Sequence, residues 1–295
     1  MWFRRKKYES FQTVGRVAGI FCYPVKSCAR LSVDRAYCSQ YGLRCKGVGD
    51  RKWMVIRPNY AFLSQRQEPK MALIQPNIDD EKYLELTAPG MEPLYLPKSP
   101  KSIIPPEILN CSVWGTEIRG EDCGNEAANW MNKFLEKDGY RMVISTDQLD
   151  KRDVKLKAGI PADCQCIYQD SAPFNILSQA SVDNLNSKVE KTVSDKNFRT
   201  NILVEGCMAF AEDTWHEIKI GNDVLFHYLE PCGRCLLPTV DPEKGVKDPK
   251  QEPYETLKKF RTPVGQNNPN FGVMISVDQE GWIQVGDPIY ALPRC

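Results

Sequence analysis

The sequence predicts a β-rich protein of the α+β class. Short extended runs recur along most of its 295 residues, and many are separated by Pro or Gly turns. This spacing is typical of a β-sandwich or β-barrel. Helical periodicity appears in only three segments. The length suffices for one large or two ordinary domains with a substantial core.

The extended runs follow one another along the whole chain. Two of them, 217–229 and 271–292, contain internal turns and therefore predict successive strands. Residues 97–107 read as a loop, and the charged, irregular residues 147–162 as a domain boundary or covering loop. The other predicted strands are 16–25, 31–39, 52–56, 71–75, 83–87, 93–96, 111–118, 140–145, 174–177, 201–204 and 236–240.

Three helices are predicted, each with a core-packing face. Residues 126–136 place apolar side chains at i, i+3, i+4, i+7 and i+8. Ser181 can cap a second helix that carries apolar side chains on one stripe. Pro253 suits the first turn of a third, with Leu257 and Phe260 facing inward.

Composition excludes several classes of protein. The formal net charge is +1, from 39 basic and 38 acidic residues, so the chain has no electrostatic footprint for nucleic acid. Its 12 cysteines stay below the ~8–10% that marks a disulfide scaffold, and no secretory signal precedes them, so free thiols in a reducing compartment are expected. No apolar run approaches the ~20 residues of a membrane span.

A Cys-x-x-Cys element, Cys232 to Cys235, lies at a bend between the extended runs 223–229 and 236–240 and contains Arg234. Three interpretations stay open. Two buried thiols are common, because free Cys packs as a small hydrophobe. The pair is alternatively half of a zinc site, or it contains a reactive or metal-bound thiolate whose pKa Arg234 lowers.

Zinc and thioredoxin-type redox chemistry are both disfavoured for this element. A structural zinc site usually takes two close pairs of ligands. Cys164 and Cys166 are too close together for a second pair, and the chain has just two histidines, His216 and His227. A thioredoxin motif begins a helix, whereas 236–240 reads as a strand.

Several polar residues stand at predicted strand ends rather than on alternating outer faces. Each alone is more often a surface residue than a ligand contact. Together they suit a phosphate-bearing, heteroatom-rich ligand, because Lys and Arg supply charge while Ser and Asn supply directional hydrogen bonds. They are Lys26, Ser27, Arg51, Arg66, Asp170, Ser171, Arg199 and Asn201.

Nine short motifs occur in a fixed order. They are Tyr23-Pro24-Val25-Lys26-Ser27-Cys28, Gly49-Asp50-Arg51-Lys52-Trp53, Arg66-Gln67-Glu68-Pro69, Asp122-Cys123-Gly124, Asn197-Phe198-Arg199-Thr200-Asn201-Ile202, Ala211-Glu212-Asp213-Thr214-Trp215, Cys232-Gly233-Arg234-Cys235, Thr239-Val240-Asp241-Pro242 and Val285-Gly286-Asp287-Pro288. As an ordered set they resemble the MOSC-domain proteins and, within them, the family of mitochondrial amidoxime-reducing components. The resemblance extends from about residue 14 to 292.

The resemblance implies a fold and a function. It implies an N-terminal β-barrel subdomain over 14–140 and a MOSC domain, a β-rich barrel with a few helices, over 141–295. It implies a monomeric oxidoreductase that carries a molybdopterin-type molybdenum cofactor and reduces N-hydroxylated substrates such as amidoximes and hydroxylamines. Electrons would come from cytochrome b5 and its NADH-dependent reductase. The alternative is a cofactor-binding or sulfur-carrier module without its own turnover.

The same resemblance implies a location. Family members face the cytosol from the mitochondrial outer membrane, held by an N-terminal anchor that this sequence does not show. The chain begins with a basic stretch, residues 1–8, where such an anchor would end.

It also implies roles for individual residues. Cys235 would be the catalytic metal ligand. Two positions depart from the family pattern, since Gly233 and Ala172 stand where relatives tend to have Ser, so a side-chain hydroxyl is missing at each. The implied cofactor contacts are Lys26, Ser27, Arg51, Asp170, Ser171, Arg199, Asn201, Gly233 and Arg234.

Overall fold

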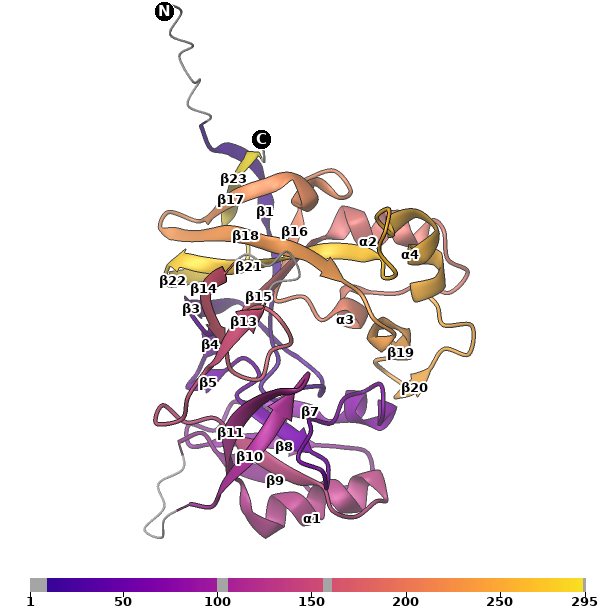
Figure 1. Ribbon diagram of the computed structural model, residues 1–295. Helices are drawn as coiled ribbons and strands as arrows, with labels where there is room; N and C mark the ends of the chain where they lie inside the picture. The colour runs from indigo at the N-terminus through magenta and orange to yellow at the C-terminus, as the bar shows by residue number, and fades with distance from the viewer. Residues whose placement is uncertain (1–9, 100–105, 156–160, 294–295) are drawn as a thin grey trace, which may run out of the picture.

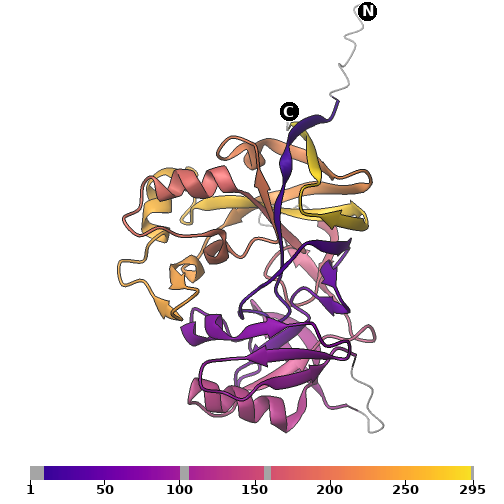
Figure 2. The ribbon, with the colours of Figure 1, turned by 180° about the vertical axis from the view of Figure 1, so that it is seen from behind.

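The computed structural model describes residues 10–99, 106–155 and 161–293. It has two lobes, one above the other in Figure 1. The upper lobe is built around a closed barrel, and the lower lobe around two smaller sheets. In the view from behind (Figure 2), the indigo N-terminal segment descends from the upper lobe towards the lower one. The predicted β-rich α+β fold with a barrel is confirmed.

The upper sheet closes on itself because its first strand, β1 (Gln12–Cys22), pairs with strands on both sides. All pairings in this sheet are antiparallel except the one that joins β15 and β16. The strands follow the order β16 (Ile202–Glu205), β15 (Phe174–Ser178), β21 (Asn270–Gln279), β18 (Val224–Gly233), β17 (Trp215–Ile220), β23 (Pro288–Pro293), β1 and β2 (Leu31–Val33).

The lower lobe and the junction use short strands. One lower sheet has the order β10 (Ile108–Val113), β11 (Thr116–Asp122), β12 (Arg141–Ile144) and β6 (Trp53–Ile56), and the other has β7 (Gln75–Asn77), β8 (Tyr83–Thr87) and β9 (Leu94–Pro97). A junction sheet has the order β22 (Gly281–Gln284), β3 (Arg35–Ser39), β4 (Gly42–Cys45) and β5 (Val48–Gly49). Two further pairs are β13 (Arg152–Lys155) with β14 (Pro161–Cys166), and β19 (Val240–Asp241) with β20 (Val246–Lys247).

Helices cover the sheets at their edges. The longest, α1 (Gly124–Leu135), buries its apolar face in the lower lobe as the sequence predicts. None of the helices in the described ranges is long and apolar enough to cross a membrane. The others are α2 (Gln179–Asn186), α3 (Asp195–Phe198) and α4 (Tyr254–Arg261), with 3₁₀ turns η1 (Pro69–Leu73), η2 (Ala211–Thr214) and η3 (Leu237–Thr239).

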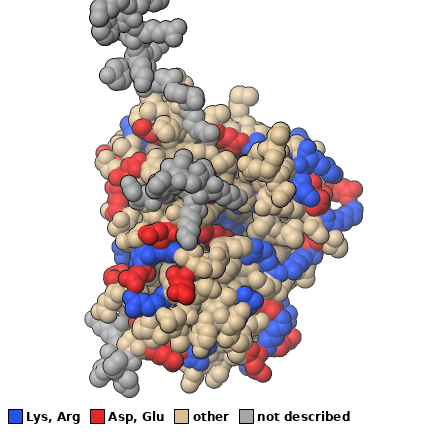
Figure 3. Space-filling view, viewed as in Figure 1, with Lys and Arg blue, Asp and Glu red and all other residues tan. Residues whose placement is uncertain are grey.

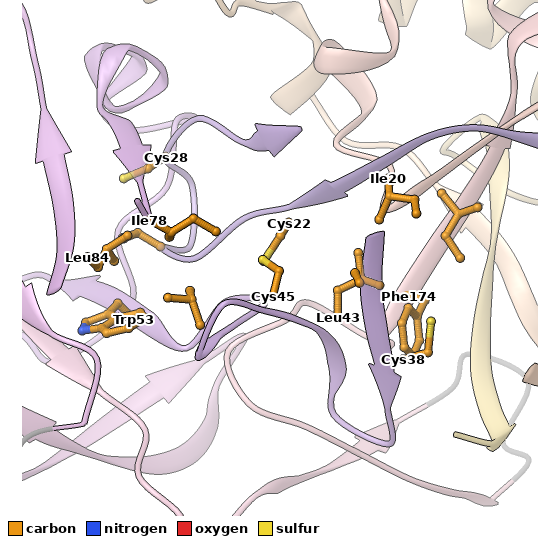
Figure 4. Close-up of a cluster of buried hydrophobic side chains, with 14 of the residues drawn as sticks. Ile20, Cys22, Cys28, Cys38, Leu43, Cys45, Trp53, Ile78, Leu84 and Phe174 are labelled. Carbon is orange, nitrogen blue, oxygen red and sulfur yellow. The ribbon is translucent and has the colours of Figure 1, made fainter. Parts of the chain in front are cut away.

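One buried hydrophobic cluster runs through both lobes. Figure 4 shows part of it, where Cys22 on β1 lies beside Cys45 on β4, with Trp53 towards the lower lobe and Phe174 towards the barrel. The cysteines in the described ranges are free thiols, and most are buried. The shared core joins the lobes, so groups on facing segments are held at fixed positions.

Some sequence predictions are exact and others are wrong. The strand predicted at 83–87 is β8. The strand predicted at 71–75 is largely the 3₁₀ turn η1, because Pro69 suits the first helical turn and short apolar runs do not distinguish strand from helix. The strand predicted at 236–240 is mostly η3, because Pro238 cannot donate a ladder hydrogen bond.

Three other predictions are corrected. The irregular segment 147–162 contains β13 and the start of β14, whose alternating side chains include the buried Val154 and Cys164. Ser178, not Ser181, caps α2, since its Oγ accepts the Ser181 N–H. Phe260 is exposed rather than inward. The division of the chain at residue 140 stays a prediction.

Candidate functional site

A cavity of about 470 Å³ lies where the two lobes meet. Figure 3 shows a hollow between them with Lys and Arg side chains in and beside it. The structure brings together every residue singled out from the sequence as a ligand contact. The cavity wall includes Lys26, Ser27, Arg51, Arg66, Asp170, Ser171, Ala172, Arg199, Asn201, Gly233, Arg234 and Cys235.

Lys26 lies in the turn that follows β1 and is only 5% exposed. Its Nζ donates to the Tyr168 carbonyl over 2.6 Å and to the Asp170 carboxylate. Burial lowers the pKa of Lys26, and Asp170 partly opposes that shift. Ser27 follows with a positive φ of 69°, which turns the chain at the cavity wall.

Asp170 accepts hydrogen bonds from two separate segments of the chain. Its Oδ1 receives Lys26 Nζ and the indole N–H of Trp114, the latter over 2.9 Å. Partial desolvation would raise the pKa of Asp170, whose side chain is half exposed, but Lys26 and then Trp114 hold that pKa below its usual value. The neighbouring Ser171 Oγ lies 3.0 Å from the Met274 sulfur. Asp170 is therefore an ionised anchor for the lysine.

Two arginines flank one buried tyrosine. The guanidinium carbons of Arg51 and Arg199 lie 4.2 and 4.3 Å from the centroid of the Tyr23 ring. Arg51 pairs with the buried Asp50, whose carboxylate raises the pKa of Arg51 against the opposing effect of burial. Asp50 also accepts the Tyr23 N–H over 2.8 Å and the Asn201 Nδ2 over 3.1 Å. One carboxylate thus fixes several members of the cavity wall.

Arg199 is the least neutralised of these groups. Its Nη1 donates to the Cys28 carbonyl over 2.7 Å, while its buried Nη2 has no hydrogen-bond partner. Burial, followed by repulsion from Arg51, lowers the pKa of Arg199 to about 10. A partly buried cation with a buried, unused donor fits an anionic ligand, because a buried donor normally has an acceptor.

The Asn201 side chain bonds to the backbone of neighbouring strands. Its side chain is buried, donates to the Phe21 carbonyl over 3.1 Å and accepts the Asn175 N–H over 3.1 Å. These contacts join the end of β1 to β15.

The Arg234 side chain also bonds to backbone atoms of neighbouring segments. It donates to the carbonyls of Phe271 and Phe198, each over 2.7 Å, and to Asn175 Oδ1 over 3.3 Å. These acceptors fix the guanidinium, so Arg234 braces the loop that carries Cys235. Its roles beside the Cys235 sulfur and in contact with a cofactor stay predictions.

The two cysteines of the Cys-x-x-Cys element differ in exposure. Cys232 is buried within β18, whereas Cys235 is half-buried immediately after that strand. The Leu237 N–H, at the start of η3, points to the Cys235 sulfur over 3.5 Å. Gly233, between them, pairs with Asn270 on β21. The strand end and the following turn together place one accessible thiol at the cavity.

Sequence reasoning missed several cavity residues, among them Arg152, Asn175 and Trp114. Arg152 is buried and donates to the Asp170 carbonyl over 3.0 Å, but its Nε has no partner. Asn175 accepts from Arg234, and Trp114 donates to Asp170. Arg152 belongs to a segment that reads as irregular, and Trp114 to a run that reads as one strand but is a hairpin. The alternation of side chains around Val154 could have predicted the strand that carries Arg152.

The wall fits an anionic organic cofactor that brings its own metal ligands. In the described residues, no group of three or more His, Cys, Asp or Glu could hold a metal ion. A protein-only metal site is therefore not present there. A single half-buried thiol suits a metal that already carries soft ligands, and the donors Arg199 Nη2 and Arg152 Nε suit an anion.

Comparisons with known proteins place the chain in a family. Residues 14–138 match the family model described as the MOSC N-terminal beta barrel domain, and residues 163–290 match the MOSC domain. Mitochondrial amidoxime reducing component 2 of Bos taurus is 41% identical, over 98% of this chain and 87% of the relative. The rat protein of that name is 39% identical over the same shares, and mitochondrial amidoxime-reducing component 1 of Homo sapiens is 40% identical over 99% and 87%. The chain therefore belongs to the mitochondrial amidoxime-reducing component family of MOSC-domain proteins.

Proposed function

We propose that this protein is a molybdenum-cofactor-dependent reductase of N-hydroxylated compounds, such as amidoximes and hydroxylamines. The observation that supports it most is the convergence of all ten sequence-predicted site residues on one cation-lined cavity with a half-buried thiol. Relatives about 40% identical over nearly the whole chain are named as amidoxime-reducing components.

The residues divide the work of holding the cofactor. Cys235 would bind the metal, and Lys26, Arg51 and Arg199 would attract the phosphate and the pterin oxygens, since charge-assisted hydrogen bonds are the strong ones. When bound, the cofactor supplies two-electron redox chemistry at molybdenum. Arg234 and Asn201 keep the wall in place through backbone carbonyls.

The overall reaction needs two electrons and two protons for each N–O bond broken, and the oxygen leaves as water. We propose cytochrome b5 and its NADH-dependent reductase as the source of electrons, in single steps. We propose that the protein acts at the mitochondrion, as the relatives' names indicate. Its proposed place there is the cytosolic face of the outer membrane, and its proposed form is a monomer.

A reconstituted chain tests this proposal. Purified protein with molybdenum confirmed by elemental analysis is mixed with NADH, cytochrome b5 reductase, cytochrome b5 and benzamidoxime, and benzamidine formation is measured. Turnover that requires every component, and that Cys235→Ala removes, supports the proposal. Absence of turnover with molybdenum present refutes it. Persulfide on a cysteine without stoichiometric molybdenum would instead favour a sulfur carrier.

A further inference from the structure

The tip of the β10–β11 hairpin carries an unusual residue at the cavity wall. Trp114 and Gly115 form a two-residue turn with φ of 54° and 77°. Positive φ at both central positions is typical of a type I′ turn, which favours Asn, Asp or Gly. A bulky residue with positive φ is an outlier that surrounding contacts must maintain. Trp114 therefore occupies this turn at a conformational cost.

Three contacts hold the indole in place. Its N–H donates to Asp170 over 2.9 Å, the Arg66 guanidinium carbon lies 4.3 Å from its ring centroid, and the Phe62 ring centroid lies 5.3 Å away. All four residues line the cavity. Even so, Trp114 is 53% exposed. A fixed aromatic ring that is half exposed at a cavity wall offers a surface for stacking.

The residues of the wall differ in exposure. Lys26, Asn201 and Arg234 are buried, whereas Trp114 is exposed and Cys235 is half-buried. Lys26 and Trp114 are neighbours, since both donate to Asp170 Oδ1. Under the proposed function, on which this inference rests, the buried cations retain the cofactor, and the exposed ring beside them is left for the molecule that enters and leaves at each turnover.

We propose that Trp114 is the stacking residue of the substrate site and that it favours planar, aromatic N-hydroxylated compounds over small aliphatic ones. Aromatic pairs contribute about 0.5–1.5 kcal/mol beyond the area they bury, which corresponds to roughly a 3- to 10-fold preference. Phe62 and Arg66 act through Trp114, because they support the ring without needing to contact the substrate.

Two substitutions at the same position isolate the ring. Trp114→Phe and Trp114→Asn both remove the indole N–H, so the lost bond to Asp170 is common to them. Asn suits the positive φ of the turn, so the variant without a ring keeps the hairpin. The substrates are benzamidoxime and acetamidoxime, which share the reacting group and differ in phenyl against methyl.

The measured quantity is the ratio of kcat/KM for benzamidoxime to kcat/KM for acetamidoxime. We expect this ratio to be roughly 3- to 10-fold lower in Trp114→Asn than in Trp114→Phe, through a higher KM for benzamidoxime. Equal ratios in the two variants would overturn the proposal. This includes the case in which activity on both substrates falls to the same extent, because that result would mean that the indole only supports Asp170.

A binding measurement separates this inference from the proposed function. If wild-type protein with molybdenum bound reduces neither oxime, the proposed function fails. Calorimetric affinities for benzamidine and acetamidine still test stacking. The same difference between the variants supports Trp114 as the stacking residue, and no difference overturns it.

Discussion

Replacing Arg199 by Gln should separate cofactor retention from folding. Burial, and then repulsion from Arg51, lower the pKa of Arg199 from its ordinary value to about 10. One pKa unit corresponds to about 1.4 kcal/mol, so the charge is buried at a cost of about 3 kcal/mol. An anion about 4 Å away at an effective dielectric constant of about 20 contributes about 4 kcal/mol, which offsets that cost.

Two outcomes follow for the Gln variant. Cofactor-free Arg199→Gln should be at least as stable as cofactor-free wild type, because the unfavourable charge is gone. Its cofactor should be retained roughly 10- to 100-fold more weakly, since a hydrogen bond to a charged group is worth about 1.5–3 kcal/mol. Turnover per bound molybdenum should change less than occupancy.

The assays are molybdenum content after dialysis and urea denaturation of the cofactor-free protein. Arg16→Gln is the matched control, because Arg16 pairs with Glu205 at an exposed site on β1 and does not line the cavity. It should keep wild-type occupancy. Normal molybdenum content in Arg199→Gln would refute the reasoning, and so would a large loss of cofactor-free stability.

Three further predictions concern the thiols and two buried carboxylates. Cys235→Ala should abolish reductase activity with the fold intact, and Cys232→Ala should be mild; the reverse order would reassign the ligand. Glu212 is buried, and burial is the main cause that raises the pKa of its carboxyl above the usual value. Ionisation of this carboxyl therefore lowers the free energy of unfolding as pH rises from about 4.5 through that raised pKa. Because Gln does not ionise, the free energy of unfolding of Glu212→Gln relative to wild type should increase between pH 5 and pH 8 in denaturant titrations. A difference that stays constant with pH would contradict this. Asp50→Asn leaves the Arg51 cation unpaired and should cost about 3–5 kcal/mol in urea denaturation, whereas the exposed Asp79→Asn should cost less than about 0.5 kcal/mol; equal losses would refute the assignment.

The sequence predicted the cavity better than it predicted the strands that surround it. Lys26, Arg51 and Arg199 were singled out because charged side chains stood at predicted strand ends, and they were grouped because the motif order resembled a known family. All of them line one cavity. The ordered motifs carry this information, since they fix which segments face each other even where a strand is shifted by several residues.

What could not be predicted depends on backbone atoms of distant segments. The acceptors of Arg234 are the carbonyls of Phe198 and Phe271, which any residue types would provide at those positions. The bond from Trp114 to Asp170 joins residues 56 positions apart. Single-sequence patterns report local periodicity, so they cannot indicate which distant carbonyls an arginine braces.

Four cations of the cavity wall, Lys26, Arg51, Arg199 and Arg234, consequently fall into two groups with different expected phenotypes. Lys26 and Arg51 pair with Asp170 and Asp50, so removing either cation also leaves a carboxylate behind and should disturb folding together with cofactor retention. Arg199 and Arg234 donate to neutral carbonyls, so their charge is not cancelled by those contacts. Arg234 makes three hydrogen bonds across the barrel edge, and its loss should release the Cys235 loop. Arg199 has an unused donor at Nη2, and for that reason its replacement should affect the bound anion with the least effect on the protein that holds it.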